Sequence, residues 1–243
     1  MLSPEEIERY RRQIEIKGFG QAGQEKLKRT RVFIAGVGGL GSPAALYLAA
    51  AGFGSLRIVD PEPVELSNLN RQLLHWTRDT GRQKVDSAGE KIRELNPEIK
   101  VETLCERIAA DNYRDLISGC DLIVDALDNL EARYLLNQAA VENRVPLFHG
   151  AVCGFEGRAL TVLPGQSACL MCLYRGVQPL EKAPVLGTTP AVIACIEVTE
   201  AVKYVTGLGR LLAGRLLIYD GLNLKFTEVQ VARDEGCAVC RGR

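Results

Sequence analysis

The chain has 243 residues, of which 47% are hydrophobic and 25% are charged, and its 30 lysines and arginines balance its 30 aspartates and glutamates. A zero net charge disfavours duplex DNA or an anionic membrane as a partner recognised by bulk charge. Because no apolar run approaches the ~20 residues of a membrane helix and the acidic N-terminus lacks a signal-peptide core, we expect a cytoplasmic protein that binds neither membrane nor nucleic acid.

The N-terminal residues predict two short helices. Ser3 precedes Pro4, and Glu6 stands three residues after Ser3, which is the pattern of a capping box at a helix start. We expect this helix to run to about Gln13 and a second helix to lie near residues 21–29.

Between residues 32 and 148, short apolar runs alternate with helical sequence. The expected strands are 32–35, 56–60, 101–104, 122–125 and 145–148, and the expected helices are 43–51, 83–95 and 129–142. Strands that alternate with helices form a parallel sheet covered by helices on both faces. The sequence therefore predicts a Rossmann-like α/β fold.

The pattern changes after Gly150. Strands are expected at 158–163, 216–219 and 225–231, together with a long helix at 191–205 and a mobile crossover loop at 176–189. We expect these strands to be antiparallel and to extend the mostly parallel sheet. Since no segment reads as a linker, residues 1–243 are expected to form a single domain.

A glycine loop follows the first expected strand and opens a helix. Gly36, Gly38 and Gly41 fit the pattern G-x-G-x-x-G, with Gly39 inside the loop. Glycine there permits a tight turn and close approach to a phosphate, and the helix N-terminus offers unpaired N–H groups. Asp60, at the end of the next strand, is positioned to accept hydrogen bonds from ribose hydroxyls. A glycine-rich turn without a ligand is the alternative, and the motif alone does not separate NAD from ATP.

A polar and basic segment follows Asp60. It contains, in chain order, Ser67, Asn68, Asn70, Arg71 and Gln72, and then Gly81, Arg82, Gln83 and Lys84. An enzyme that cleaves ATP between its α- and β-phosphates must neutralise charge on the departing pyrophosphate. Arg71 and Lys84, with Arg12 brought in by the N-terminal helix, could supply that positive charge. For each residue taken singly, a solvated surface charge is the alternative.

Two carboxylates, Asp125 and Asp128, stand where an expected strand ends. Carboxylates at this edge of a sheet, near a phosphate loop, suit Mg²⁺. Asp128 also has a structural alternative, because with Glu131 it fits an N-capping pair for the following helix. The spacing leaves both roles open.

Four of the eight cysteines form two C-x-x-C pairs. Cys169 with Cys172 and Cys237 with Cys240 supply four thiolates, which is the ligand set of a closed, structural Zn²⁺ site. Because 64 residues separate the two pairs, the metal would staple the end of the chain to the loop near residue 170. A thioredoxin-like redox site is the alternative, but it needs only one pair.

Taken together, these motifs resemble those of the MoeB/ThiF/HesA family, bacterial relatives of the ubiquitin-activating enzymes, and most closely the MoeB pattern. The matching segments are 9–14 (R-Y-x-R-Q), 36–41 (G-x-G-G-L-G), 67–72 (S-N-L-x-R-Q), 81–84 (G-x-x-K), 125–129 (D-x-x-D-N) and the two C-x-x-C pairs. The resemblance covers nearly the whole chain, in the family's order.

The resemblance implies that ATP adenylates the C-terminal glycine carboxylate of a ubiquitin-like sulfur carrier ending in Gly-Gly, similar to MoaD or ThiS, with release of pyrophosphate. It further implies that Asp60 holds the ribose, that Arg71 and Lys84 hold the phosphates, and that Asp128 works through Mg²⁺. Arg12 looks like the arginine that in family dimers reaches the neighbouring subunit's site, which implies a homodimer. The same motifs add Ser67, Asn68, Asn70 and Asn129 to the expected nucleotide-binding set.

One departure from the family concerns a cysteine that some members carry in the crossover loop. Here no cysteine lies between Leu173 and Ala194, and Cys195 falls inside an expected helix. We therefore predict an enzyme that stops at the acyl-adenylate and relies on a separate sulfur donor. Because the attacking carboxylate is already ionised at neutral pH, neither His75 nor His149 is assigned a catalytic role.

Three other functions compete with this interpretation. An NAD-dependent oxidoreductase explains the glycine loop and Asp60 but leaves Arg71, Lys84 and the cysteine pairs unexplained. A non-catalytic adaptor predicts losses among the charged site positions, and none is missing. An ATP-dependent tRNA-modifying branch of the same superfamily is disfavoured by the zero net charge and by the presence of both C-x-x-C pairs.

Overall fold

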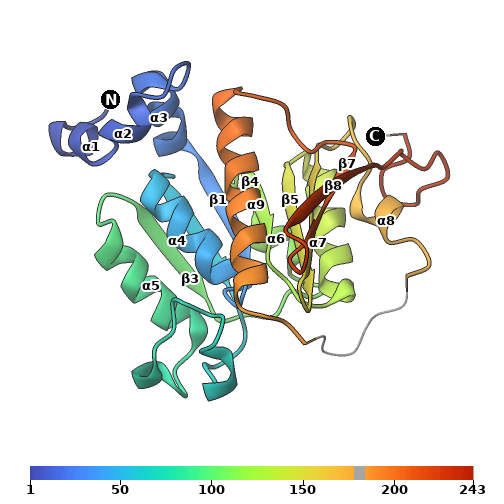
Figure 1. Ribbon diagram of the computed structural model, residues 1–243, viewed down its shortest axis with the longest axis horizontal. Coiled ribbons are helices and arrows are strands. Elements are labelled where there is room, and N and C mark those ends of the chain that lie inside the picture. The colour runs from blue at the N-terminus through green and yellow to red at the C-terminus, as the bar shows by residue number, and fades with distance from the viewer. Residues whose placement is uncertain (178–183, 243) are drawn as a thin grey trace.

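An eight-stranded sheet forms the centre of the computed structural model, which describes residues 1–177 and 184–242 (Figure 1). Its strands are β1 Arg31–Ala35, β2 Ser55–Val59, β3 Lys100–Leu104, β4 Leu122–Asp125, β5 Leu147–Cys153, β6 Glu156–Val162, β7 Arg215–Asp220 and β8 Lys225–Gln230. They lie in the order β3-β2-β1-β4-β5-β6-β7-β8. The pairs from β3 to β5 are parallel, and those from β5 to β8 are antiparallel. The expected Rossmann-like sheet and its antiparallel extension are confirmed.

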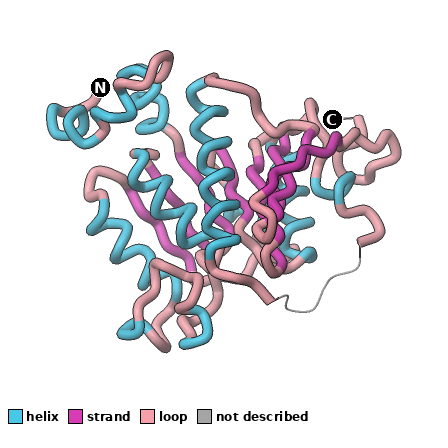
Figure 2. Tube along the Cα trace, viewed as in Figure 1, coloured by secondary structure: helices cyan, strands magenta, loops and turns pink. Residues whose placement is uncertain are grey.

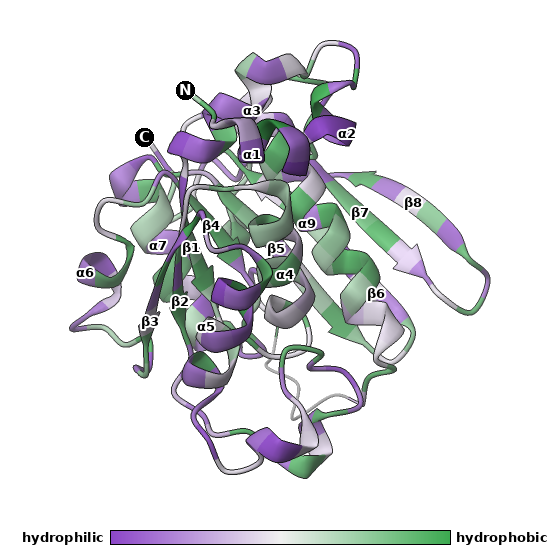
Figure 3. Cartoon of the chain, turned by 90° about the vertical axis from the view of Figure 1, so that its left-hand side faces the viewer, coloured by the Kyte–Doolittle hydropathy of each residue, from purple (hydrophilic) through white to green (hydrophobic). Residues whose placement is uncertain are grey.

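Helices cover both faces of this sheet (Figure 2). They are α1 Pro4–Arg9, α2 Arg11–Ile14, α3 Gly20–Arg29, α4 Gly41–Ala51, α5 Lys84–Leu95, α6 Tyr113–Ile117, α7 Leu130–Asn143, α8 Leu170–Leu173 and α9 Thr188–Thr206. The alternation of side chains along a strand sends Val32 and Ile34 into one core, with α3, α4, α5 and α9. It sends Phe33 and Ala35 into the other, with α6, α7 and α8. Figure 3 shows the hydrophobic central strands inside these helices.

The first helix differs from the prediction. Its capping box is confirmed, because Ser3 accepts a hydrogen bond from the Glu6 N–H and the Glu6 carboxylate accepts one from the Ser3 N–H. The helix ends at Arg9 rather than near Gln13, and α2 begins after Tyr10. Tyr10 is buried and its hydroxyl accepts a hydrogen bond from Asn96, so a tertiary contact fixes the point where the chain turns.

The parallel register brings the carboxyl ends of β1, β2 and β4 to one edge of the sheet. In Figure 1 this is the lower edge, where α4 and α9 begin. The residues between β2 and α5, which include the short 3₁₀ helices Leu66–Asn68 and Thr77–Asp79, extend below it. Of the crossover loop expected at 176–189, residues 178–183 lie outside the described residues. Among the described helices, none combines the length and apolar character that crossing a membrane requires.

Candidate nucleotide site and cysteine cluster

The glycine loop connects β1 to α4 in the way that the sequence predicts. Gly36 has a φ of +88°, and a Cβ on it would lie 2.9 Å from the Ala126 carbonyl oxygen. A Cβ on Gly41 would lie 2.0 Å from the Gly36 carbonyl oxygen. A side chain at Gly36 would therefore push the β1 and β4 loops apart, and one at Gly41 would break the tight turn of the glycine loop itself. Gly38 and Gly39 are half-buried, with Gln72 and Arg71 beside them at ordinary contact distance.

Asp60 follows β2 directly and is nearly buried. Its Oδ2 accepts a hydrogen bond of 2.9 Å from the Val37 N–H in the glycine loop, and its Oδ1 accepts one of 2.9 Å from the Glu62 N–H. Burial raises the pKa of Asp60, although the nearby Lys84 charge opposes the rise. Asp60 thus already fixes the loop, and its predicted bond to a ribose would be an additional contact.

The two predicted phosphate-binding cations lie near this loop. The aliphatic carbons of Arg71 would be 3.5 Å from a Cβ on Gly39, and its guanidinium donates to the Ser67 carbonyl and to Asn70 Oδ1. Lys84 is the first residue of α5; its side chain is 4% exposed, and its Nζ lies 2.7 Å from Glu62 Oε2. A nearly buried ammonium is costly without compensating anions, and here Glu62 and the nearby Asp60 supply them.

The polar residues of the segment 67–70 have different surroundings. Ser67 and Asn70 are exposed, whereas Asn68 is buried and its Oδ1 accepts a hydrogen bond from the Glu65 N–H. Asn70 holds the Arg71 guanidinium. Asn68 therefore shapes the turn, and Ser67 and Asn70 are the members of the predicted set that face outward with Arg71.

The two carboxylates after β4 do not share one environment. Asp125 is fully buried; its Oδ2 lies 2.7 Å from His149 Nδ1 and 3.5 Å from Arg133 Nε. Although burial opposes ionisation, Arg133 and the hydrogen bond from His149 keep the pKa of Asp125 below its usual value. Asp128 is exposed. The structure therefore does not support the prediction that both carboxylates face a magnesium ion: Asp125 is already engaged inside the protein.

The predicted capping pair of Asp128 and Glu131 is wrong. The N-cap of α7 is Asn129, whose Oδ1 accepts a hydrogen bond of 2.9 Å from the Ala132 N–H. Aspartate and asparagine cap helices about equally well, so the sequence could not decide between these neighbours. The shift by one residue leaves the Asp128 carboxylate outside the helix and exposed to solvent.

Both histidines, to which the sequence assigned no catalytic role, lie directly behind the site. His149 connects Asp125 to the Tyr174 hydroxyl, each at 2.7 Å. His75 lies 3.1 Å from the Val37 carbonyl in the glycine loop and 3.0 Å from Ser87 Oγ. The position of His149 in β5, beside Asp125 in the next strand, is the signal that could have identified it; His75 had no comparable strand-end position.

Arg12 is not near the glycine loop of its own chain. Its side chain is 88% exposed, and its guanidinium lies 3.6 Å from the Glu15 carboxylate. The helix α2 packs near the C-terminal end of α4, where Tyr10 contacts the position of Gly52, while the glycine loop is at the N-terminal end of α4 (Figure 1). Within one chain Arg12 therefore lies away from the glycine loop, and the role predicted for it requires a second copy of the chain.

The four paired cysteines come together as the sequence predicts. Cys169 Sγ lies 3.9 Å from Cys172 Sγ and 3.7 Å from Cys237 Sγ, Cys172 Sγ lies 3.5 Å from Cys240 Sγ, and all four sulfurs are within 4.8 Å of one another. A tetrahedral Zn²⁺ with bonds of about 2.3 Å requires sulfurs about 3.8 Å apart. Four thiolates this close together would repel one another, so a cation is needed between them if all four are ionised. The cluster could hold zinc.

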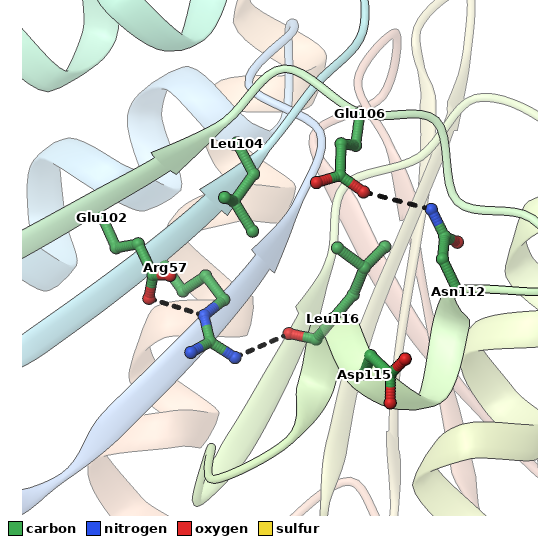
Figure 4. Close-up of a pocket in the computed structure, with 7 residues that line it drawn as sticks. All are labelled: Arg57, Glu102, Leu104, Glu106, Asn112, Asp115 and Leu116. Carbon is green, nitrogen blue, oxygen red and sulfur yellow. Dashed lines mark hydrogen bonds and ion pairs between the residues drawn. The ribbon is translucent and has the colours of Figure 1, made fainter.

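A surface hollow of about 290 Å³ lies beside β3 and α6 (Figure 4). It is lined by Arg57, Glu102, Leu104, Glu106, Asn112, Asp115 and Leu116. The Arg57 guanidinium there is already bound to Glu102 at 2.7 Å and to the Leu116 carbonyl at 2.9 Å. None of the predicted site residues lines this hollow.

Comparison with known proteins identifies the family of the chain. The sequence model of the ThiF family matches residues 10–239. The chain is 40% identical to the SAMP-activating enzyme E1 of Haloferax volcanii, covering 98% of this chain and 90% of that protein. It is also 40% identical to the sulfur carrier protein adenylyltransferase of Thermus thermophilus, covering 97% and 91%.

Two solved structures share the fold. The crystal structure of PaaA has a TM-score of 0.83 at 29% identity, covering 95% of this chain and 84% of that one. The structure of Escherichia coli MccB with ATP has a TM-score of 0.80 at 23% identity, covering 90% and 68%. At that identity, MccB supports the fold alone.

Proposed function

The chain belongs to the ThiF family and is an adenylyltransferase of the ubiquitin-activating type, and from that premise we propose its reaction. It uses ATP to adenylate the C-terminal glycine carboxylate of a small ubiquitin-like sulfur carrier that ends in Gly-Gly, with release of pyrophosphate. The names of its relatives support this substrate class, since one is a sulfur carrier protein adenylyltransferase and another a SAMP-activating enzyme.

The observation that carries the proposal is the combination of cations and glycine loop at one edge of the sheet. Arg71 packs against Gly39, and the nearly buried Lys84 lies beside Asp60 and Glu62. Cleavage between the α- and β-phosphates places new negative charge on pyrophosphate, and preorganised cations stabilise it. Transfer of a hydride from NAD creates no such charge, so the alternative function, an NAD-dependent oxidoreductase, does not explain why Arg71 and Lys84 lie here.

The reaction needs positioning rather than a general base. A carrier carboxylate oxygen attacks the α-phosphorus, the bond from that phosphorus to the bridging oxygen breaks, and pyrophosphate leaves with the electron pair. Two anions must be held in line against their repulsion, which is the task of Arg71 and Lys84. Burial lowers the pKa of His75 to about 4, so this histidine is neutral near pH 7 and adds no charge.

Asp128 is the residue proposed to hold Mg²⁺. Its exposed carboxylate lies two residues before Leu130, the first residue of α7, and Mg²⁺ is typically bound by one or two carboxylates together with phosphate oxygens. When bound, the ion would offset phosphate charge. Asn129 acts through its cap, which fixes where α7 begins and so where the Asp128 backbone lies.

We further propose that the chain works as a homodimer and passes its product on. The helix α2, which carries the exposed Arg12, lies at the far end of the sheet from the glycine loop of its own chain, so a role for Arg12 at a nucleotide site requires the partner's site. Cys195 lies within α9 and burial raises the pKa of its thiol, which disfavours a thioester there. A separate protein therefore supplies sulfur to the adenylated carrier.

The test is ATP–pyrophosphate exchange with carriers of the MoaD and ThiS types, each compared with a version that lacks the terminal Gly-Gly. Exchange that depends on an intact carrier supports the proposal, and the preferred carrier identifies the biosynthetic pathway. Exchange with tRNA in place of any carrier would favour the tRNA-modifying branch. No exchange with any partner, together with measurable NAD binding, would sink the proposal.

A further inference from the structure

A buried chain of hydrogen bonds supports the glycine loop from behind. The Val37 carbonyl oxygen lies 3.1 Å from His75 Nε2, His75 Nδ1 lies 3.0 Å from Ser87 Oγ, and Ser87 Oγ lies 2.8 Å from Lys91 Nζ. Lys91 Nζ in turn lies 2.6 Å from Asp79 Oδ2. All five residues are buried. The chain thus runs from an internal ion pair to the backbone of the loop.

The direction of each bond follows from what each atom can do. A carbonyl oxygen only accepts, so His75 Nε2 must carry a hydrogen, and in a neutral imidazole Nδ1 is then an acceptor. Ser87 must therefore donate to Nδ1, since its other acceptor, the Leu74 carbonyl, is at 3.5 Å. An ammonium only donates, so Lys91 donates to Ser87 Oγ. Burial lowers the pKa of His75 to about 4, which keeps the imidazole neutral and this order intact.

Fixing the Val37 carbonyl also fixes the next N–H group. In a planar trans peptide the C=O of one residue and the N–H of the next point in opposite directions, and the chain has no cis peptide bond among its described residues. The Val37 carbonyl is held inward by His75 and by Ser42 Oγ at 2.9 Å. The N–H of the half-buried Gly38 therefore points outward, and it has no protein acceptor in the described part of the chain.

We propose that His75 is a positioning residue for nucleotide binding. By donating from Nε2 to the Val37 carbonyl, it orients the Val37–Gly38 peptide so that the Gly38 N–H is available to a phosphate oxygen. Asp60 holds the same residue from the other side, through the Val37 N–H. This inference rests on the proposed function in one respect, because it takes ATP as the phosphate ligand.

The first experiment compares ATP dissociation constants for the wild type, His75→Gln and His75→Phe. Gln places an amide donor near the position of Nε2, whereas Phe keeps a ring and removes the donor. We expect His75→Phe to weaken ATP binding about tenfold and His75→Gln to recover most of the loss. At saturating ATP, the exchange rate and the carrier KM should stay within about twofold of the wild type.

Leu27→Ala is the matched control for a general loss of stability. Leu27 is fully buried in α3, which lies at the opposite end of the sheet from the loop. The proposal predicts that Leu27→Ala lowers the melting temperature without weakening ATP binding. Equal loss of ATP affinity in Leu27→Ala and His75→Phe, or wild-type affinity in His75→Phe, would overturn it.

A second measurement does not depend on ATP. The chain has two histidines, and their partners predict opposite tautomers, with the hydrogen on Nε2 in His75 and on Nδ1 in His149, where Asp125 accepts it. Nitrogen-15 chemical shifts of the ring atoms distinguish the two forms, and His75→Gln assigns the signals. A hydrogen on Nδ1 of His75 would refute the proposed direction of the hydrogen bonds that His75 makes. If the tautomers are as predicted but the wild type does not bind ATP, the proposed function fails and the hydrogen-bond geometry stands.

Discussion

Removing the metal from the cysteine cluster should destabilise the whole fold by an amount that the loop length sets. A metal held by all four thiolates cross-links residue 172 to residue 237, with 64 residues between them. The chain-entropy estimate for a loop of this length gives ~4 kcal/mol. For a domain of this size, 1 kcal/mol shifts the melting temperature by ~2–4 °C. Loss of the metal should therefore lower the melting temperature by ~8–16 °C.

The assay is thermal unfolding of the purified chain, as isolated and after extraction of metal with a chelator, with the zinc content of both samples measured by mass spectrometry. Cys240→Ser should reproduce the effect of the chelator, because it removes one of the four ligands. Cys105→Ser is the matched control, since Cys105 is exposed and outside the cluster. We expect one zinc per chain and no shift for the control.

Three results would refute this reasoning. Complete removal of zinc with a change in melting temperature under ~2 °C would mean that the metal cross-link does not constrain the unfolded chain as the loop estimate requires. If the chain as isolated contains no zinc and its melting temperature does not change after treatment with the chelator, the four thiols do not need a metal. Formation of two disulfides in the isolated protein would also contradict the assignment.

Three further predictions concern the site and its support. Asp128→Asn should lower carrier-dependent exchange by on the order of 10²-fold or more with little change in melting temperature, because Asp128 is exposed and does not cap α7; a large loss of stability would contradict this. An equal mixture of Arg12→Ala and Asp128→Asn chains should recover about a quarter of wild-type exchange, because half the dimers are mixed and each has one complete site, whereas no recovery would exclude action across a dimer. Burial raises the pKa of Asp79, but hydrogen bonds from Lys91 and the Trp76 N–H outweigh this effect and lower the pKa from 3.8 to about 2. Since the folded pKa is below the unfolded one, the ionised carboxylate stabilises the fold above pH ~4 and loses this effect as the pH falls to ~2. The difference in the free energy of unfolding by urea between the wild type and Asp79→Asn should therefore shrink by ~2 kcal/mol over that range. A difference that stays constant with pH would contradict the lowered pKa.

The sequence predicted the features that depend on local patterns. Strand and helix alternation predicted the parallel sheet. Glycine is required at 36, where the β1 loop meets the β4 loop, and at 41, where the glycine loop turns back on itself. The capping box at Ser3 is local as well. The four cysteines could be paired because two identical C-x-x-C motifs have few interpretations other than one metal site.

The features that the sequence missed depend on contacts between distant residues. The break at Tyr10 comes from a hydrogen bond to Asn96, 86 residues away. The inward direction of Asp125 depends on His149 from the neighbouring strand. The role of His75 depends on Val37 and Ser87 on either side of it. None of these pairings has a spacing that periodicity or a motif could reveal.

The central claim is that this chain transfers AMP to the C-terminal carboxylate of a carrier. The most direct measurement is the intact mass of a Gly-Gly carrier after brief incubation with the chain, ATP and Mg²⁺, followed by rapid acid quenching. We predict a carrier whose mass is increased by one AMP group, with no increase when the terminal Gly-Gly is deleted or when Asp128→Asn is used. ATP consumption without AMP on the carrier, or AMP attached to the truncated carrier, would contradict the account.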